Sequence, residues 1–436
     1  MLFYKTVCYF TNVIKFRRNN MKRFLALLLA LVMVLSFAAC SSNEPANDNG
    51  TESGSSENNS EEKSGVSKDD ILVGFIHIGD PSDMGYTYNH DLGTKKMAEN
   101  LGLRDDQIIN KYNIGEDETC AVAIEELVAA GCDIIFATSF GHGDYMTEAA
   151  AKYPNIEFCH ATGTQAAASG LSNYHNYFSA IYQPRYICGV AAGLKLNEMI
   201  ANGEITEDEA VLGYVSAFYF EEVISGFTAF YLGARSVCPA ATMITLKANS
   251  WSDPTAEATL AQALIDKGAV IISQHSDNTT PATVAESNGL YHCGYNSDMS
   301  EAAPGASIIS ARADWSVYLT YAVECVINGE EIDTDWCYGY SEGVTYTSPL
   351  NTAIAAPGTQ EVLDDVVEKL ISGETKVFEG PWTGFNVWTG EDYTCAEGEW
   401  VEESVERSAP YFAYLIEGIT VLDPDPDSVI LQKQGK

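Results

Sequence analysis

Basic residues are scarce in this sequence: 24 lysines and arginines stand against 61 aspartates and glutamates, for a formal net charge of −37. A protein that binds nucleic acid needs a basic surface, so we expect no nucleic-acid partner. The cysteines after Cys40 are scattered singly without a C-x-x-C pair, which argues against a disulfide framework and structural zinc. The sequence also lacks a Gly-x-Ser-x-Gly elbow, a metal-ligand spacing and a Walker loop. We therefore predict a protein without catalytic residues, cofactor or metal.

The first 40 residues predict a lipoprotein signal peptide. Lys22 and Arg23 precede an apolar run that ends at Phe37, and Ala-Ala-Cys40 follows. In a bacterial lipobox the thiol at this position is acylated and becomes the new amino terminus, so we predict lipidation of Cys40, with Met21 as the natural start. The apolar run is shorter than the roughly 20 residues that a membrane-spanning helix needs.

Residues 41–70 predict a disordered acidic tether. They are almost wholly Ser, Asn, Glu, Gly, Asp and Lys and include no aromatic residue, so they cannot bury enough apolar surface to fold. A flexible chain of about 30 residues reaches roughly 30 Å. A lipidated Cys40 and this tether predict a domain that faces outside the cytoplasm and is anchored to the cell membrane.

The rest of the chain is long enough for two lobes and alternates between strand-like and helix-like segments. Residues 72–78 form an apolar run typical of a strand buried on both faces, and 88–100 are amphipathic, as in a helix. The same alternation continues through both lobes, so we predict an α/β fold with parallel, doubly wound sheets. Gly189 and Gly193, four residues apart in a predicted helix, favour close packing of that helix against a sheet.

Polar and aromatic side chains gather in the loops that follow the predicted strands. Ligands bind at the carboxyl ends of the strands in open α/β sheets, so these residues are candidates for one ligand site: Asp83, Tyr86, Ser139, Phe140, Asp144, Phe218, Trp251, Asp277, Asn296 and Asp298. Trp251 stands between Asn-Ser and Ser-Asp-Pro, which is a poor setting for a core residue. Three structural alternatives stay open: Asp144 as a helix cap, Phe218 as a core residue and Asp277 as a turn former.

Several of these motifs together resemble one known family. Gly85-Tyr-Thr-Tyr-Asn-His-Asp, Ala137-Thr-Ser-Phe-Gly, Tyr182-Gln-Pro-Arg-Tyr-Ile-Cys-Gly, Asn249-Ser-Trp and Gly294-Tyr-Asn-Ser-Asp-Met-Ser resemble motifs of the basic membrane lipoprotein family. That family comprises ABC-transporter substrate-binding proteins and includes purine nucleoside receptors. The resemblance covers roughly residues 71–381. It implies a type I periplasmic-binding fold, two doubly wound lobes joined by a hinge.

The resemblance also implies roles for individual residues. In the family an aromatic residue of the first loop stacks on the purine, and Tyr86 holds that position; Phe140 and Asp144 match the second loop, and Phe218 matches an aromatic loop of the second lobe. The family's late Asp falls near Asn296 and Asp298. The first of these is often Asp where ribose is bound, and the family's Lys after the next strand is missing from residues 308–315. Whether the ligand is a base or a nucleoside is left open.

The resulting hypothesis is a monomeric, lipid-anchored solute-binding protein of an ABC importer, with a small-molecule ligand and a membrane permease as partners. Because type I folds return a late segment to the first lobe, we expect lobe 1 at residues 71–183 and 310–342, and lobe 2 at 184–309 and 343–436. Two alternatives are a secreted hydrolase of nucleosides and a ligand-sensing receptor for a sugar, since a sugar also stacks on Trp and pairs with Asp.

Replacing Cys40 with Ala is expected to release the domain into the medium, because the acyl anchor cannot form without the thiol. Immunoblots of membrane and medium fractions measure this, with Ser41→Ala as the matched control that keeps the thiol. A Cys40→Ala protein that stays with the membranes would show instead that the apolar leader is retained as an anchor.

Overall fold

The computed structural model describes residues 64–404, 407–426 and 428–434. The leader, Cys40 and the predicted tether up to residue 63 lie outside these residues. In the part of the chain that is described, no helix is both long enough and apolar enough to cross a membrane. The folded part begins before the predicted limit at residue 70, because the Val66 amide donates to the Val326 carbonyl at 3.1 Å and the Val66 side chain packs against the first lobe's core.

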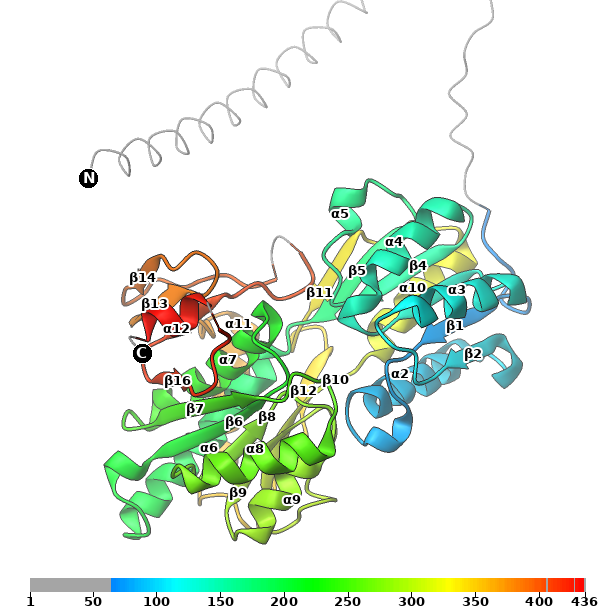
Figure 1. Cartoon of the computed structure of the whole chain (residues 1–436). Helices are drawn as coiled ribbons and strands as arrows, with labels where there is room; N and C mark the ends of the chain where they lie inside the picture. Colours follow the sequence, from blue (N-terminus) through cyan, green and yellow to red (C-terminus); the bar gives the residue numbers. More distant parts are fainter. Residues whose placement is uncertain (1–63, 405–406, 427, 435–436) are drawn as a thin grey trace, which may run out of the picture. The chain divides into compact units, whose positions relative to one another are not determined.

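Lobe 1 is built on a six-stranded sheet in which all neighbouring strands are parallel (Figure 1). Its strand order is β11 (Asp335–Tyr338), β5 (Tyr174–Ser179), β4 (Glu157–Ala161), β3 (Ile134–Ala137), β1 (Val73–Ile76) and β2 (Ile108–Lys111). Its helices are α2 (Tyr86–Leu101), α3 (Glu118–Ala130), α4 (Gly143–Lys152), α5 (Ala166–Ser169) and α10 (Ser316–Asn328). Short 3-10 turns lie at Pro81–Asp83, Asp105–Gln107 and Phe140–His142.

Both faces of this sheet are covered, as the apolar strand runs predict. Phe75 and Phe136 pack in one cluster with residues of α2 and α10. Ile76 and Ile135, which are adjacent to these residues in the same strands, pack in a second cluster with α3 and α4. Successive strand residues point to opposite faces, so a continuous apolar run is required when both faces are buried.

Lobe 2 contains a seven-stranded sheet in which every pairing is parallel except that of β10 with β12. The strand order is β12 (Thr345–Thr347), β10 (Ser307–Ala313), β9 (Tyr291–Tyr295), β8 (Ile271–Gln274), β6 (Val211–Ser216), β7 (Thr242–Lys247) and β16 (Ile419–Val421). Its helices are α6 (Tyr182–Ala201), α7 (Glu221–Val237), α8 (Pro254–Asp266), α9 (Thr280–Ser287), α11 (Thr359–Ser372) and α12 (Val429–Lys433), with a 3-10 turn at Glu207–Glu209.

Helices also cover both faces of the second sheet. One core cluster joins the sheet to α6 and α7, and another joins it to α8 and α9. A separate antiparallel sheet near the C-terminus, of order β14 (Asp392–Cys395), β13 (Trp382–Asn386) and β15 (Tyr414–Ile416), extends the α6 and α7 cluster. The predicted α/β class with doubly wound parallel sheets is confirmed.

The chain passes between the two sheets more than once. It leaves the first sheet after β5, returns to α10 after β10, and leaves again between β11 and β12. The predicted crossing at residue 310 is wrong, because that residue lies inside β10, a strand of the second sheet. The return to lobe 1 comes after Ala313. The other predicted limits stay a prediction.

Helices α6 and α7 of lobe 2 approach each other closely, and glycines permit this approach. A Cβ added at Gly189 would overlap the Phe230 carbonyl of α7, one at Gly193 would overlap the Ala234 carbonyl, and one at Gly233 would overlap the Tyr186 carbonyl of α6. Gly189 and Gly193 therefore serve helix–helix packing. The predicted contact of these glycines with a sheet is wrong, because the backbone of α7 occupies that side of α6.

We expect Gly189→Ala to lower the free energy of unfolding by about 1–3 kcal/mol, the usual cost of overpacking a core. In an exposed helix the same change would stabilise by about 1 kcal/mol, so the direction of the effect tests the contact. Urea denaturation measures it, and Ser236→Ala on the exposed side of α7 is the control. A Gly189→Ala protein as stable as the parent would contradict the close approach.

Candidate ligand-binding site

The two sheets and the C-terminal segment together line a cavity of about 900 Å³, including the part that is open to solvent. Lobe 1 contributes Tyr86, Ser139 and Phe140, among others, and lobe 2 contributes Trp251 and Asp277. These five predicted site residues are therefore brought together at the carboxyl ends of the strands. A wider hollow beside the cavity shares Trp251 and Asp277 and is also lined by Asp83 and Phe218.

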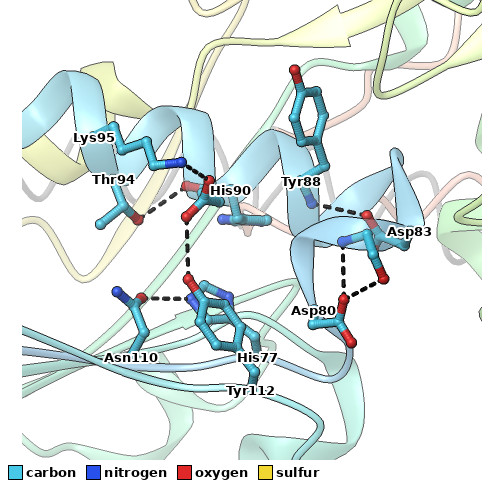
Figure 2. Close-up of polar contacts among 11 residues, drawn as sticks. His77, Asp80, Asp83, Tyr88, His90, Thr94, Lys95, Asn110 and Tyr112 are labelled. Atoms are coloured by element: carbon cyan, nitrogen blue, oxygen red, sulfur yellow. Dashed lines mark hydrogen bonds and ion pairs between the residues drawn. The ribbon is translucent and has the colours of Figure 1, made fainter.

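Asp83 acts on the backbone of its own loop (Figure 2). Its Oδ1 accepts from the Tyr88 amide at 3.0 Å, as Figure 2 shows. The same oxygen accepts from the Gly85 amide at 2.9 Å, and the Oδ2 of Asp83 accepts from the Thr87 amide at 2.8 Å. Burial raises the pKa of this carboxyl, while the backbone bonds oppose that rise. Because both oxygens hold the first turn of α2, Asp83 is placed to cap the helix.

Gly85 allows the two lobes to approach each other. It precedes α2, and a Cβ at this position would overlap the Asp277 carbonyl of lobe 2. The first loop of lobe 1 thus touches the loop after β8. Only a residue without a side chain fits this contact.

Tyr86 is the first residue of α2. The prediction started this helix at Tyr88 and therefore placed Tyr86 in the preceding loop. Its hydroxyl donates to the Thr138 carbonyl at 2.6 Å, and its ring meets the His90 ring edge-on at 4.6 Å. His90 in turn stacks on Trp315 at 4.4 Å. Only 8% of Tyr86 is exposed, so it offers the cavity a ring whose position is fixed.

Of the three residues predicted in and after the loop that follows β3, two line the cavity and one does not. The Ser139 hydroxyl donates to Glu116 Oε1 at 2.7 Å, which the Gly141 amide also contacts, and Ser139 and Phe140 line the cavity. Asp144 is exposed in the first turn of α4, accepts from Gln165 Nε2 at 3.0 Å, and lines neither hollow. Asp144 is not the cap of α4, because the N-cap position is His142 and Asp144 lies within the first turn, where the helix dipole favours a carboxylate.

A row of aromatic rings crosses from one lobe to the other. Phe140 of lobe 1 stacks on Phe220 of lobe 2 at 5.6 Å, Phe220 stacks on Phe218 at 5.0 Å, and Trp251 meets Phe218 edge-on at 4.9 Å. Phe218 lines the outer hollow and Phe220 lines the cavity. Phe220 is not among the candidate residues predicted from the sequence, although its spacing of two from Phe218 in an extended loop indicates that both rings project to one side.

Asp277 is the most buried carboxylate of the cavity, with 6% of the residue exposed. Burial raises its pKa well above the usual value, and the nearby Asp83, Glu257 and Glu222 raise it further. Its Oδ1 accepts a long 3.4 Å hydrogen bond from Asn296 Nδ2. The carboxylate therefore keeps acceptor capacity for a ligand.

Asn296 and Asp298 do not line the cavity or the hollow beside it. Asn296 is buried in a left-handed conformation with φ of 67°, and its carbonyl accepts from Arg312 Nε at 3.1 Å. Asp298 Oδ1 accepts from the amide and hydroxyl of Ser300 at 3.1 and 2.7 Å. Asn296 thus supports Asp277, and Asp298 closes its own turn.

A buried charged network, which the sequence analysis missed, forms one side of the cavity. Arg185 Nη1 donates to the Tyr214 hydroxyl at 2.6 Å and to the Gln274 carbonyl at 3.0 Å, and its guanidinium lies 3.7 Å from the centre of the Tyr295 ring. Arg185 Nη2 lies 3.0 Å from His275 Nδ1. The one signal in the sequence is a single basic residue within the apolar first turns of a helix.

The same network determines which ring nitrogen of His275 carries the proton. Burial lowers the pKa of this imidazole. The nearby Glu222 raises this pKa, and Arg185 lowers it. Since Nδ1 accepts from Arg185, Nε2 carries the proton and donates to Glu222 Oε2 at 2.6 Å. Glu222 lines the cavity, and its Oε1 is buried without a partner among the described residues. Glu222 is therefore a second acceptor for a ligand.

Arg185→Met should reduce the free energy of unfolding by about 3–5 kcal/mol, because it leaves Tyr214, the Gln274 carbonyl and His275 without their charged donor. Arg235→Met is the matched control: that guanidinium donates to the Pro381 carbonyl at the surface, and its loss should cost less than about 1 kcal/mol. Chemical denaturation measures the free energy of unfolding of both variants. An equal loss of stability in the two would show that the buried contacts of Arg185 contribute no more than the surface contact of Arg235.

Comparison with known proteins identifies the family. The model of the PnrA-like ABC transporter substrate-binding proteins matches residues 71–378. A purine-binding protein of Brucella abortus is 32% identical over 317 residues, which cover 72% of this chain and 85% of that protein. A putative ABC transporter glucose-binding protein of Haloferax volcanii is 30% identical over 314 residues, covering 71% and 74%.

Solved structures support the same fold. An ABC transporter solute-binding protein from Aeropyrum pernix superposes with a TM-score of 0.58 at 17% identity, covering 71% of this chain and 94% of that one. The predicted type I periplasmic-binding architecture and the predicted family are thus both confirmed. The chain belongs to the PnrA-like family of ABC transporter substrate-binding proteins.

Proposed function

We propose that this protein is a lipid-anchored, extracytoplasmic receptor that binds a purine base or nucleoside between its two lobes and delivers it to an ABC permease. It acts as a monomer and does no chemistry on the ligand. The proposal combines the family with the chemistry of the cavity.

The observation that carries the proposal is the lining of the cavity. Aromatic side chains from both lobes, including Tyr86, Phe220 and Trp251, line the cavity together with the carboxylates of Asp277, which is buried, and Glu222, which is partly buried. A flat heterocycle gains about 0.5–1.5 kcal/mol from each ring contact beyond area burial. The N–H groups on its edge match the free acceptors of the carboxylates. A purine has both features.

The relatives supply a second line of support and a competing ligand. The Brucella abortus relative is described as purine-binding, and the Haloferax volcanii relative as a putative glucose-binding protein. A hexose is the second candidate, because its hydroxyls also donate to carboxylates. We favour the purine, since several rings in one cavity suit a ligand with two flat faces. The hydrolase alternative has no support from the family, whose members bind substrates.

Among purines, two features favour a base such as adenine over a nucleoside. Asn296, at the position where the family often has Asp, is engaged with Asp277 and Arg312 and does not line the cavity. Arg312, in the segment where the family's Lys is missing, packs over Tyr346 at 5.2 Å from its ring. Neither residue is placed to bind ribose hydroxyls.

The anchoring part of the proposal rests on the sequence alone. Lys22 and Arg23, the apolar run up to Phe37 and Ala-Ala-Cys40 have the order of a lipoprotein leader. An anchored receptor next to the bilayer suits an importer, because the permease that receives the ligand lies in the same membrane.

A thermal-shift panel tests the ligand class. We expect adenine and related purines to raise the melting temperature, while glucose, pentoses and amino acids leave it unchanged. A ligand at about 100 times its dissociation constant adds roughly 2.7 kcal/mol to stability. Trp251→Ala should weaken purine binding by roughly 5- to 150-fold, by analogy with base stacking at nucleic-acid sites.

Trp388→Ala is the matched control, because that indole is exposed and lines neither hollow. Isothermal titration of both variants separates a ligand contact from a general effect of losing a tryptophan. A shift with glucose or a pentose and none with any purine would overturn the purine assignment. Release of free base from inosine or adenosine would overturn the receptor assignment.

A further inference from the structure

Residues 401–403 and 411–412 are held in lobe 2 by hydrogen bonds and ring packing. The Val401 amide donates to the Phe378 carbonyl at 3.3 Å, and Phe412 is fully buried, stacked on Phe378 at 4.2 Å. Glu403 joins the two ends, because its carboxylate accepts from the amides of Tyr411 and Phe412. Burial raises the pKa of Glu403 to about 7. Residues 407–412, which we call the strap, therefore have a fixed base in lobe 2.

The strap reaches lobe 1 at Ser408. The amide and the hydroxyl of Ser408 both donate to Asp335 Oδ1, each at 3.1 Å. Asp335 is the first residue of β11, the strand at the edge of the first sheet, and Figure 1 shows the orange-red C-terminal chain passing close to this strand. Ser408 is 1% exposed. The strap is thus held by both lobes.

The strap also forms part of the cavity wall. Arg407, Ala409 and Pro410 line the cavity together with Tyr86, Trp251 and Asp277. Arg407 shapes the strap itself, because its Nε and Nη2 donate to the carbonyls of Ala409 and Pro410, each at 3.3 Å. The family match ends at residue 378, so these three lining residues come from outside the family-matched part of the chain.

We propose that the strap completes the ligand cavity and ties the lobes together, with Arg407, Ala409 and Pro410 as ligand-contacting residues that govern ligand size and release. The proposal rests on the proposed function in one respect, that the cavity binds a small ligand. A ligand enclosed between the lobes leaves when they separate, and separation breaks the contact between Ser408 and Asp335. The strap therefore slows dissociation.

Asp335→Ala removes the lobe 1 partner of Ser408 and so breaks the contact between the strap and lobe 1, which we call the tie. Asp333→Ala is the control, because it removes an exposed carboxylate two residues earlier. With adenine as the probe, stopped-flow fluorescence should show dissociation about tenfold faster for Asp335→Ala, the change expected from losing a hydrogen bond to a charged group. Asp333→Ala should match the parent. Equal dissociation rates in all three proteins would overturn the tie.

Hydrogen exchange tests the tie without any ligand. In the free protein, Asp335→Ala should accelerate exchange at the Ser408 amide at least about tenfold and leave the Phe412 amide, held by Glu403, unchanged. Unchanged exchange at Ser408 would refute the tie whatever the ligand is. Faster exchange at Ser408 in a protein that binds no purine would keep the tie and reject the purine assignment.

Ala409→Leu tests the cavity wall, because it places a larger side chain where the strap faces the ligand. We expect at least a tenfold loss of affinity for the panel member that binds, and a greater loss for adenosine than for adenine if both bind. Ala201→Leu, on an exposed part of α6, should change neither affinity. A well-folded Ala409→Leu protein with parental affinity for every probe would show that the strap does not contact the ligand.

Discussion

The candidate site depends on the contacts that the buried guanidinium of Arg185 makes with its neighbours. It starts from α6 and reaches the Tyr214 hydroxyl, the Gln274 carbonyl, the His275 ring and the face of Tyr295. These partners come from β6, β8 and β9 and the loop after β8, so one cation joins the carboxyl ends of three strands. A buried cation is costly unless it is paired and fully hydrogen-bonded, and the arrangement around Arg185 meets most of that requirement.

The same cation sets the polarity of the cavity. Burial lowers the pKa of His275, whose Nδ1 accepts from Arg185 and whose Nε2 donates to Glu222. Glu222 Oε1 has no hydrogen-bond partner in the described part of the chain. Asp277 lies nearby with a raised pKa and one long hydrogen bond. The cavity thus offers acceptors on a largely aromatic background. These features support the proposed flat ligand that carries N–H donors.

Among the described residues, three of the contacts that join the lobes around this cavity differ in physical character. Gly85 meets the backbone of Asp277 without a side chain, Phe140 stacks on Phe220, and Ser408 donates to Asp335. Closure therefore relies on steric fit, ring stacking and a charge-assisted hydrogen bond together. The third contact belongs to the C-terminal strap, which lies beyond the family-matched residues. The strap therefore adds to the cavity lining from outside the residues that the family model matches.

The α/β fold class and the family could be predicted from the amino-acid order alone, and five of the ten candidate residues line the cavity. Strand periodicity and loop position are local properties, so Tyr86, Phe140, Trp251 and Asp277 were found where parallel strands must end. Tertiary structure decided which carboxylates are free: those of Asp83 and Asp298 are used by nearby backbone amides, and that of Asp144 lies at the surface. It also decided the Arg185 network and the strap. Arg185 meets a histidine 90 residues away and Ser408 an aspartate 73 residues away, and no local pattern encodes contacts of that range.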